Sequence, residues 1–291
     1  VIVPAMTWKS TLIAPLNLGL NTILVDIEKD SSNIDLKDLK KKITKKTRAI
    51  ICVHTYGHPC NMDEIKKLVK GKKISIIEDC AEAIGTKFKG RNIGSFGRFS
   101  VFSFYGNKTI TTGEGGMVLF KNKKDFLRCK NLRNHGMDEK KKYWHNQIGF
   151  NFRMTNLQAA IGVAQFEKIN YFIRNKINIA NEYKKNLQGF KNIVLPFEEK
   201  WAQHSYWLYT VLIKNISKNT RDKLIKKLND AGIEARPMFY PASDMKIYRK
   251  FINKNSKFKK ISYSGISLPS FVGLKKKQIK SICKKLKELI I

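Results

Sequence analysis

The chain has 291 residues, enough to bury a full core and to divide into one large and one smaller domain. Its 57 basic and 23 acidic residues give a formal net charge of +34, which raises the question of nucleic-acid or membrane binding. Only ten basic residues are Arg, and the Lys are spread over nearly every predicted helix face. We therefore interpret the charge mainly as a solvated Lys-rich surface whose field draws anionic substrates, with no nucleic-acid partner.

The sequence contains no signal for export or membrane insertion. It opens on Val1 with neither a charged, apolar leader nor an apolar run of membrane-spanning length. The five cysteines are scattered and form no Cys-x-x-Cys pair of the kind that binds zinc or cycles between redox states. We expect a cytoplasmic protein with no membrane partner.

Short apolar runs alternate with amphipathic stretches over the first 120 residues, a pattern typical of a helix-flanked, mainly parallel sheet. Helical spacing appears at Leu36, Leu39 and Ile43, and again at Ile65 and Leu68. This half therefore predicts α/β architecture, with strands at 22–26, 49–53, 74–78, 99–104 and 117–120.

The second half predicts a smaller α+β unit. Residues 156–187 form one long predicted helix with few helix breakers, followed by a strand at 206–213, a helix at 220–231 and a strand from Ile233. A basic amphipathic helix over 275–290 closes the chain, with its apolar face docked on the small unit. We place the boundary inside the long helix, giving a large domain of residues 1–168 and a small domain of residues 169–291.

Two strand ends carry the candidate chemistry. The strand Ile74 to Glu78 leads directly to Asp79, at the end of a parallel strand where ligands bind in open α/β sheets. Taken alone, this segment favours Asp79 as a helix cap or turn residue over a functional one. A second strand contains Ser103 and is followed by Lys108 and a glycine cluster at 113–116, which alone is only a tight connection.

The combination is more specific than its parts, because pyridoxal phosphate (PLP) chemistry needs these residue types together. A lysine forms a Schiff base with the cofactor, a carboxylate faces the pyridine nitrogen, and hydroxyl or backbone donors hold the phosphate. Asp79, Ser103 and Lys108 supply these groups in chain order. The sequence therefore predicts a PLP enzyme.

Five blocks resemble the DegT/DnrJ family of PLP-dependent sugar aminotransferases, and the resemblance extends over nearly the whole chain. It implies the PLP-dependent transferase fold type I, like aspartate aminotransferase, with a large mixed-sheet domain and a small α+β C-terminal domain. The blocks lie at 1–8, 53–57, 78–85, 102–116 and 149–160.

The resemblance implies a role for two residues in the chemistry itself. Lys108 matches the lysine bound to the cofactor, and Asp79 matches the partner of the pyridine nitrogen. A carboxylate there keeps that nitrogen protonated, so that the ring accepts the electron pair released when a Cα proton leaves. A freed Lys108 is then the base that moves this proton.

Four further residues match family positions around the cofactor. Trp8 matches the aromatic ring stacked on the pyridine, although a bare Trp is equally a core residue. Ser103 matches a phosphate-binding hydroxyl, and Glu82 lies beside the cofactor's 3-oxygen, where many members have Gln or His. Asn151 matches an amide that reaches the phosphate of the neighbouring subunit's cofactor, which implies a homodimer with shared active sites.

The resemblance also implies the substrates, L-glutamate as amino donor and a nucleotide-linked keto sugar as acceptor. It is strongest to the branch that aminates C4 of GDP-4-keto-6-deoxymannose for surface polysaccharide synthesis; dTDP- or UDP-linked sugars are the alternatives. Ser243 stands where a His is common near the sugar nucleotide, so it bears on substrate choice.

Other readings stay open at this point. A sugar dehydratase of the same family has His in place of the cofactor lysine, and Lys108 argues against it. A basic nucleic-acid-binding protein would bind DNA in a salt-dependent manner. An inactive remnant is the third, because the family has an N-terminal arm and a Gly-Thr-Ala-type phosphate-binding turn before the segment that matches Val1 to Trp8; we therefore expect the N-terminal part to be missing and PLP binding to be weak.

The histidines add no predicted site. His54 and His58 imitate a metal-ligand spacing, but a Gly-Pro turn lies beside them and no acidic third ligand is evident, so we predict no metal site. We assign no specific role to His135 and His204.

Overall fold

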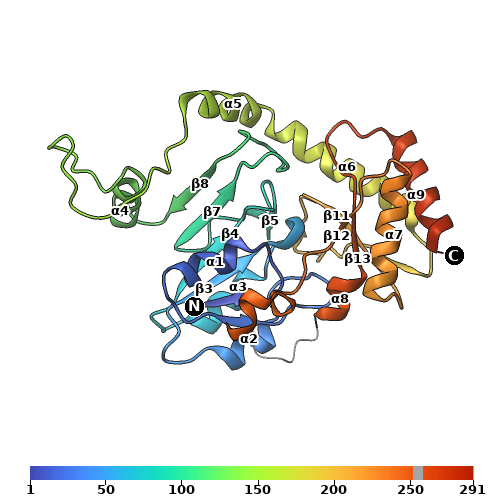
Figure 1. Ribbon diagram of the computed structural model, residues 1–291, viewed down its shortest axis with the longest axis horizontal. Helices are drawn as coiled ribbons and strands as arrows, with labels where there is room; N and C mark the ends of the chain where they lie inside the picture. The colour runs from blue at the N-terminus through green and yellow to red at the C-terminus, as the bar shows by residue number, and fades with distance from the viewer. Residues whose placement is uncertain (252–257, 291) are drawn as a thin grey trace.

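The computed structural model describes residues 1–251 and 258–290, which form two units joined through α5 (Asn156–Glu167) and α6 (Ile169–Leu187) (Figure 1). The larger unit is built on a six-stranded sheet in the order β2-β1-β3-β4-β7-β8. All neighbouring strands are parallel except β8, which is antiparallel to β7. The sheet is therefore mixed, as expected. Its strands are β1 (Ile2–Pro4), β2 (Ile23–Val25), β3 (Ala49–Val53), β4 (Ser75–Asp79), β7 (Phe99–Ser103) and β8 (Gly116–Phe120).

The predicted strands of this unit agree with the observed ones to within one or two residues at each end. Apolar side chains of β3 and β4, including Ile50, Cys52 and Ile76, are buried in a core with α2 and α3. Helix α1 (Ser10–Asn17) follows β1, and α2 (Leu36–Lys42) and α3 (Met62–Val69) begin at side-chain caps from Asp35 and Asn61. A small sheet of β5 (Lys87–Phe88), β6 (Arg91–Asn92) and β10 (Ala202–Gln203) and the short 3₁₀ helix η1 (Thr55–Gly57) complete the unit.

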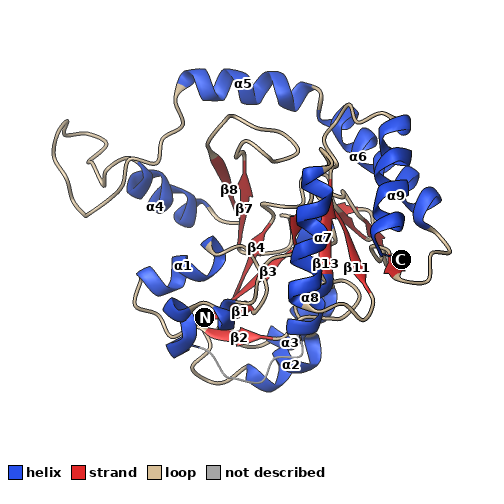
Figure 2. Cartoon of the chain, turned by 45° about the vertical axis from the view of Figure 1, so that its right-hand side comes forward, coloured by secondary structure: helices blue, strands red, loops and turns tan. Residues whose placement is uncertain are grey.

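The smaller unit has its own antiparallel sheet and core. Its sheet has the order β12-β13-β11-β9, and α6, α7 and α9 supply the apolar side chains that pack against it. Figure 2 shows α7 and α9 beside this sheet. The elements are α6 (Ile169–Leu187), β9 (Ile193–Val194), β11 (Tyr209–Ile213), α7 (Lys218–Asp230), β12 (Arg236–Pro237), α8 (Lys259–Ser264), β13 (Gly265–Leu268) and α9 (Lys276–Ile290). Two short 3₁₀ helices from this part of the chain, η2 (Ala242–Asp244) and η3 (Lys246–Phe251), pack instead against β1, α1 and β3 of the larger unit.

The prediction of one long helix over 156–187 is wrong, because two helices meet at Lys168. Helix α5 (Asn156–Glu167) ends at Lys168, which is also the N-cap of α6 and has φ −98° and ψ 10°. No Pro or Gly marks the break. The two helices differ in packing: α5 has no buried residue, whereas α6 buries five on the smaller unit. Tertiary packing therefore redirects a locally continuous helical pattern, and the domain boundary at 168 and 169 stays a prediction.

Residues 134–155, between α4 (Lys123–Arg133) and α5, project away from both sheets (Figure 1). Several large apolar side chains there and on α5 are exposed, among them Ile148, Phe152 and Leu157. In the described ranges, we find no helix with the length and apolar character needed to cross a membrane.

Candidate active site

Asp79 closes β4 and lies where the carboxyl ends of the parallel strands meet. Its Oδ2 accepts a hydrogen bond from Thr11 Oγ1 at 2.8 Å, and its Oδ1 accepts one from the Ala81 N–H at 3.1 Å. Thr11 in turn lies 3.0 Å from the hydroxyl of Thr7. The segment after β1 thus fixes the carboxylate at the end of β4.

Lys108 faces Asp79 and Glu82 from the loop that follows β7. Burial lowers the pKa of Lys108, and the negative charges of Glu82 and Asp79 partly oppose that effect. Glu82 is buried, and this burial raises its pKa to about 7, although the charge of Lys108 and a 2.8 Å hydrogen bond from the Tyr56 N–H oppose the rise. Two segments of the chain therefore converge, the turn that carries Asp79 and Glu82 and the loop that carries Lys108.

Aromatic rings surround this charged group. Nζ of Lys108 lies 3.8 Å from the ring centroid of Trp207, and Trp207 stacks on Tyr56 at 6.2 Å between centroids. Phe239 contacts Tyr56 at 5.1 Å and Trp8 at 5.9 Å. Trp8 is 59% exposed, so one face of its ring is open to a ligand.

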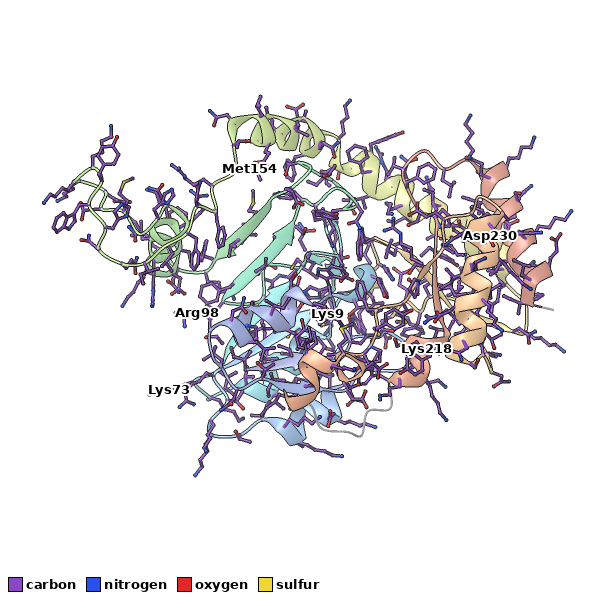
Figure 3. The ribbon with its side chains drawn as sticks, viewed as in Figure 1. Lys9, Lys73, Arg98, Met154, Lys218 and Asp230 are labelled. Atoms are coloured by element: carbon purple, nitrogen blue, oxygen red, sulfur yellow. The ribbon has the colours of Figure 1, made fainter. Side chains whose placement is uncertain are left out.

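The two units meet at this group of rings. The Phe239 N–H donates to Tyr56 Oη at 3.0 Å, and Lys9 Nζ donates to the Tyr240 carbonyl at 3.0 Å. Figure 3 shows Lys9 at the centre of the molecule, between the sheet of the larger unit and the helices of the smaller one. The candidate site therefore lies at a boundary between units, a common position for ligand sites.

Gly57 lets the segment 204–207 cross η1 closely. A Cβ at Gly57 would lie 2.6 Å from Ser205 Oγ and 2.8 Å from the Tyr206 nitrogen, and its φ is +105°. The Gly57 carbonyl accepts from the Ser205 N–H at 3.1 Å and from Thr86 Oγ1 at 2.6 Å. This crossing places Trp207 over Lys108.

Glu78, the residue before Asp79, is buried, and both of its carboxylate oxygens accept hydrogen bonds. Its Oε1 accepts from the N–H groups of Phe96 and Gly97 at 2.7 and 2.6 Å and lies 3.3 Å from Ser100 Oγ. Its Oε2 accepts from the Gly94 N–H at 2.8 Å and from His54 at 3.1 Å. Burial alone would raise the pKa of Glu78, but these hydrogen bonds lower it to about 2.

His54 and His58 have separate partners. His54 Nδ1 accepts from the Cys60 N–H at 3.0 Å, so its Nε2 carries the proton donated to Glu78. A ligand atom each of His54, Glu78 and Cys80 lies within 4.8 Å of the others, and the donors around Glu78 account for its burial. His58 lies against Asn33 and Pro59, and burial lowers its pKa to about 4.

Comparison with known proteins identifies the family. The family model described as the DegT/DnrJ/EryC1/StrS aminotransferase family matches residues 1–287. The chain belongs to this family. It is a PLP-dependent sugar aminotransferase with the fold of that group.

Individual relatives agree with this assignment. The chain is 42% identical to GDP-perosamine synthase of Escherichia coli O157:H7 over 99% of this chain and 78% of that one. It is 41% identical to GDP-perosamine synthase of Vibrio cholerae, over 97% and 77% of the two chains. Among solved structures, Helicobacter pylori PseC, an aminotransferase involved in pseudoaminic acid biosynthesis, superposes with a TM-score of 0.94 at 25% identity, over 99% and 79% of the chains.

The side chains of this aminotransferase fit PLP. An amine at Lys108, a carboxylate fixed at Asp79 and the open ring of Trp8 are the groups that the cofactor's carbonyl carbon, pyridine nitrogen and ring face require. Ser103, at the end of β7, has its Oγ 3.3 Å from the Tyr105 nitrogen and accepts from it. Its hydroxyl hydrogen remains available to a phosphate.

Asn151 lies apart from these residues, on the projecting segment. It forms an isolated bridge with Asn134, and its Oδ1 accepts from Arg153 Nε at 3.2 Å. His135, on the same segment, has φ +61° and lies 3.5 Å from Arg153. Asn151 therefore has local contacts within its own chain.

Four residues of the site were not predicted from the sequence: Thr11 beside Asp79, and Tyr56, Trp207 and Phe239 among the rings near Lys108. For Tyr56 the indication comes from the structure: its backbone is left-handed, at φ +52°, beside Gly57. Trp207 precedes a run of apolar strand residues and resembles a core residue there.

The structure also shows the surroundings of His204 and Ser243. His204 is buried, stacks on Tyr206 at 3.8 Å, and its Nδ1 accepts from the Tyr206 N–H at 2.9 Å. Ser243 lies in η2, and its buried Oγ has no hydrogen-bond partner in the described parts of the chain. Ser243 Oγ is therefore a buried polar atom without a partner among the described residues.

Proposed function

We propose that this aminotransferase transfers the amino group of L-glutamate to C4 of GDP-4-keto-6-deoxymannose, forming GDP-perosamine for surface polysaccharide synthesis in the cytoplasm. The observation that carries the enzymatic part is the convergence of Lys108, Glu82 and Asp79. The GDP sugar is supported by the two relatives named GDP-perosamine synthase, at 42% and 41% identity.

We assign the cofactor contacts to this chain's own residues. When bound, PLP supplies an electron sink that acidifies the C–H bond next to the substrate nitrogen. Asp79 would hold a proton on the pyridine nitrogen, and Thr11 and Ala81 keep its carboxylate oriented. Trp8 would cover the ring face, and Ser103 would donate to the phosphate.

Lys108 would have two tasks, to hold the cofactor covalently and to act through its free amine as the base that moves a proton. Burial lowers its pKa, which increases the fraction of neutral amine able to accept a proton. Glu82 would stand beside the cofactor's 3-oxygen. Because burial raises the pKa of Glu82 to about 7, this carboxyl can exchange a proton near neutral pH.

We propose that the enzyme is a homodimer whose sites share residues. The exposed apolar side chains of the projecting segment and α5, such as Ile148 at 91% and Leu157 at 80%, are the surface that a second copy would cover. Asn151 lies on that segment, from which its amide reaches the partner's cofactor phosphate.

Two alternatives within the family concern the reaction and the nucleotide. A dehydratase is disfavoured by Lys108, because that branch has His there. A dTDP- or UDP-linked acceptor remains the alternative for specificity, and Ser243 is the residue whose free hydroxyl bears on it.

One experiment tests the proposal. The protein is incubated with PLP, L-glutamate and GDP-, dTDP- and UDP-linked 4-keto sugars, and 2-oxoglutarate and amino sugars are measured by mass. We expect turnover of the GDP sugar and an amine at C4 by NMR. Efficient turnover of a dTDP or UDP sugar without the GDP sugar would refute the substrate assignment.

A further inference from the structure

We infer that Trp207, contributed by the smaller unit, is a positioning residue for Lys108: its ring covers Nζ and its indole N–H fixes the backbone immediately before the lysine. The inference rests on the proposed role of Lys108 as the cofactor lysine. It extends that proposal by assigning a task to a residue that touches the lysine from the other side of the site.

Trp207 makes two independent contacts with the Lys108 loop. Its ring centroid lies 3.8 Å from Lys108 Nζ, within the range of a cation–π interaction. Its Nε1 donates to the Asn107 carbonyl at 2.8 Å. The ring contact orients the amine end of the Lys108 side chain, and the hydrogen bond fixes the backbone just before Lys108. The position of Nζ is therefore restricted from both directions.

The indole is itself held rigidly. Trp207 is only 5% exposed and packs between Tyr56 and Phe239. Its carbonyl accepts from the buried Nζ of Lys176, on α6, at 2.7 Å, and from Ser270 Oγ at 3.3 Å. A side chain fixed by its backbone and by rings on its flanks positions its neighbour without reorganising during the reaction.

The electrostatics of the contact predict its effect on Lys108. The negative face of an indole attracts an ammonium more than a neutral amine. Glu82 and Asp79 face Lys108 from the larger unit and also favour its charged form, whereas burial favours the neutral form. Removing the Trp207 ring therefore takes away one group that favours the charged form of Lys108, so its pKa should fall. It also leaves the Lys108 side chain free to move.

The test uses Trp207→Leu, which removes the ring, and Trp207→Phe, which keeps an aromatic face but removes the N–H. Trp201→Phe is the matched control, because Trp201 packs on Phe88 and His58 and not on Lys108. The pKa of Lys108 is measured in the apo-protein by competitive acetylation across pH, with its peptide quantified by mass spectrometry. Steady-state kcat and KM for glutamate are measured in the holoenzyme, with the keto sugar that wild type turns over as the amino acceptor.

We expect W207L to lower the pKa of Lys108 by about 0.5 to 1.5 pH units and to lower kcat by about 10- to 100-fold, with a smaller change in KM. W207F should leave that pKa within about 0.5 of wild type yet lower kcat by about 3- to 10-fold, because the Asn107 contact is lost. W201F should match wild type in both measurements.

An unchanged pKa and kcat in W207L would overturn the inference. If W207L does not fold, W207F decides, and wild-type kcat in folded W207F would overturn it equally. Failure of the proposed function looks different: reduction of the holoenzyme with borohydride and peptide mapping would place the cofactor on another lysine, whatever the labelling of apo Lys108 shows.

Discussion

Replacing Glu78 with Gln should strongly destabilise the protein, because the buried carboxylate accepts from donors on both oxygens. If the Gln oxygen takes the place of Oε1, the amide NH₂ takes the place of Oε2. It would then face the Gly94 N–H and the His54 Nε2–H, two donors that no longer have an acceptor. At about 1 to 3 kcal/mol for each buried unpaired group, the cost is about 2 to 6 kcal/mol.

The pKa of Glu78 gives a second value for the same interaction. Hydrogen bonds lower this pKa from 4.5 to about 2 in the folded chain, and a difference of that size corresponds to about 3 kcal/mol of stability. Because the pKa of Glu78 is lower in the folded chain, the carboxylate contributes its full stabilisation of the fold above pH 4.5, its pKa in the unfolded chain. This contribution is lost as the pH falls toward about 2. The two magnitudes agree.

Urea unfolding of wild type and E78Q at one protein concentration, from pH 7 down to pH 3, measures the difference directly. We expect a gap of about 3 kcal/mol at pH 7 that narrows below pH 4.5. Glu234→Gln is the control, because its exposed ion pair with Arg236 contributes little. A gap below about 1 kcal/mol, or one that is independent of pH, would refute the reasoning.

Three further predictions concern the candidate site. Asp79→Asn should keep the fold, since Thr11 still finds an oxygen, but slow the glutamate half-reaction by about 100-fold or more in stopped-flow absorbance; near-normal rates would contradict the assigned role. Lys108→Ala and Asn151→Ala, each inactive alone, should recover up to about a quarter of wild-type activity when co-expressed, because one site of each mixed dimer is intact; purified mixed dimers without activity would rule out shared sites. Wild type should show a change in cofactor absorbance between pH 6 and 8, because the Glu82 carboxyl is neutral below about pH 7 and charged above it. Glu82→Gln should abolish this change, and its persistence would assign the titration to another group.

The sequence was sufficient to predict five of the six strands of the larger sheet, but not β1. Glu82 is predicted by the family resemblance alone. By contrast, the strands that end at Asp79 and Ser103 have strong apolar runs, and parallel strands bring their carboxyl ends together, so Asp79 and Lys108 can be predicted from the sequence itself. These residues depend on features local to one strand and the turn that follows it.

What was missed depends on contacts between distant segments. The break at Lys168 has no helix-breaking residue, and β5, β6 and β10 have two residues each, too few for a periodic pattern. Trp207 lies 100 positions from the carbonyl that its indole binds. Such a pairing follows from how the smaller unit docks, which local sequence does not encode.

The crossing at Gly57 makes stability and catalysis difficult to separate in this enzyme. A methyl group at position 57 would push Ser205 and Tyr206 away, and Trp207 follows directly in the chain. A substitution of Gly57, which has no titratable side chain, would therefore lower the reaction rate in the same way as a substitution that disturbs Lys108. Among natural variants of this chain, we expect position 57 to be invariant, because any side chain there would displace the segment 204–207 from η1.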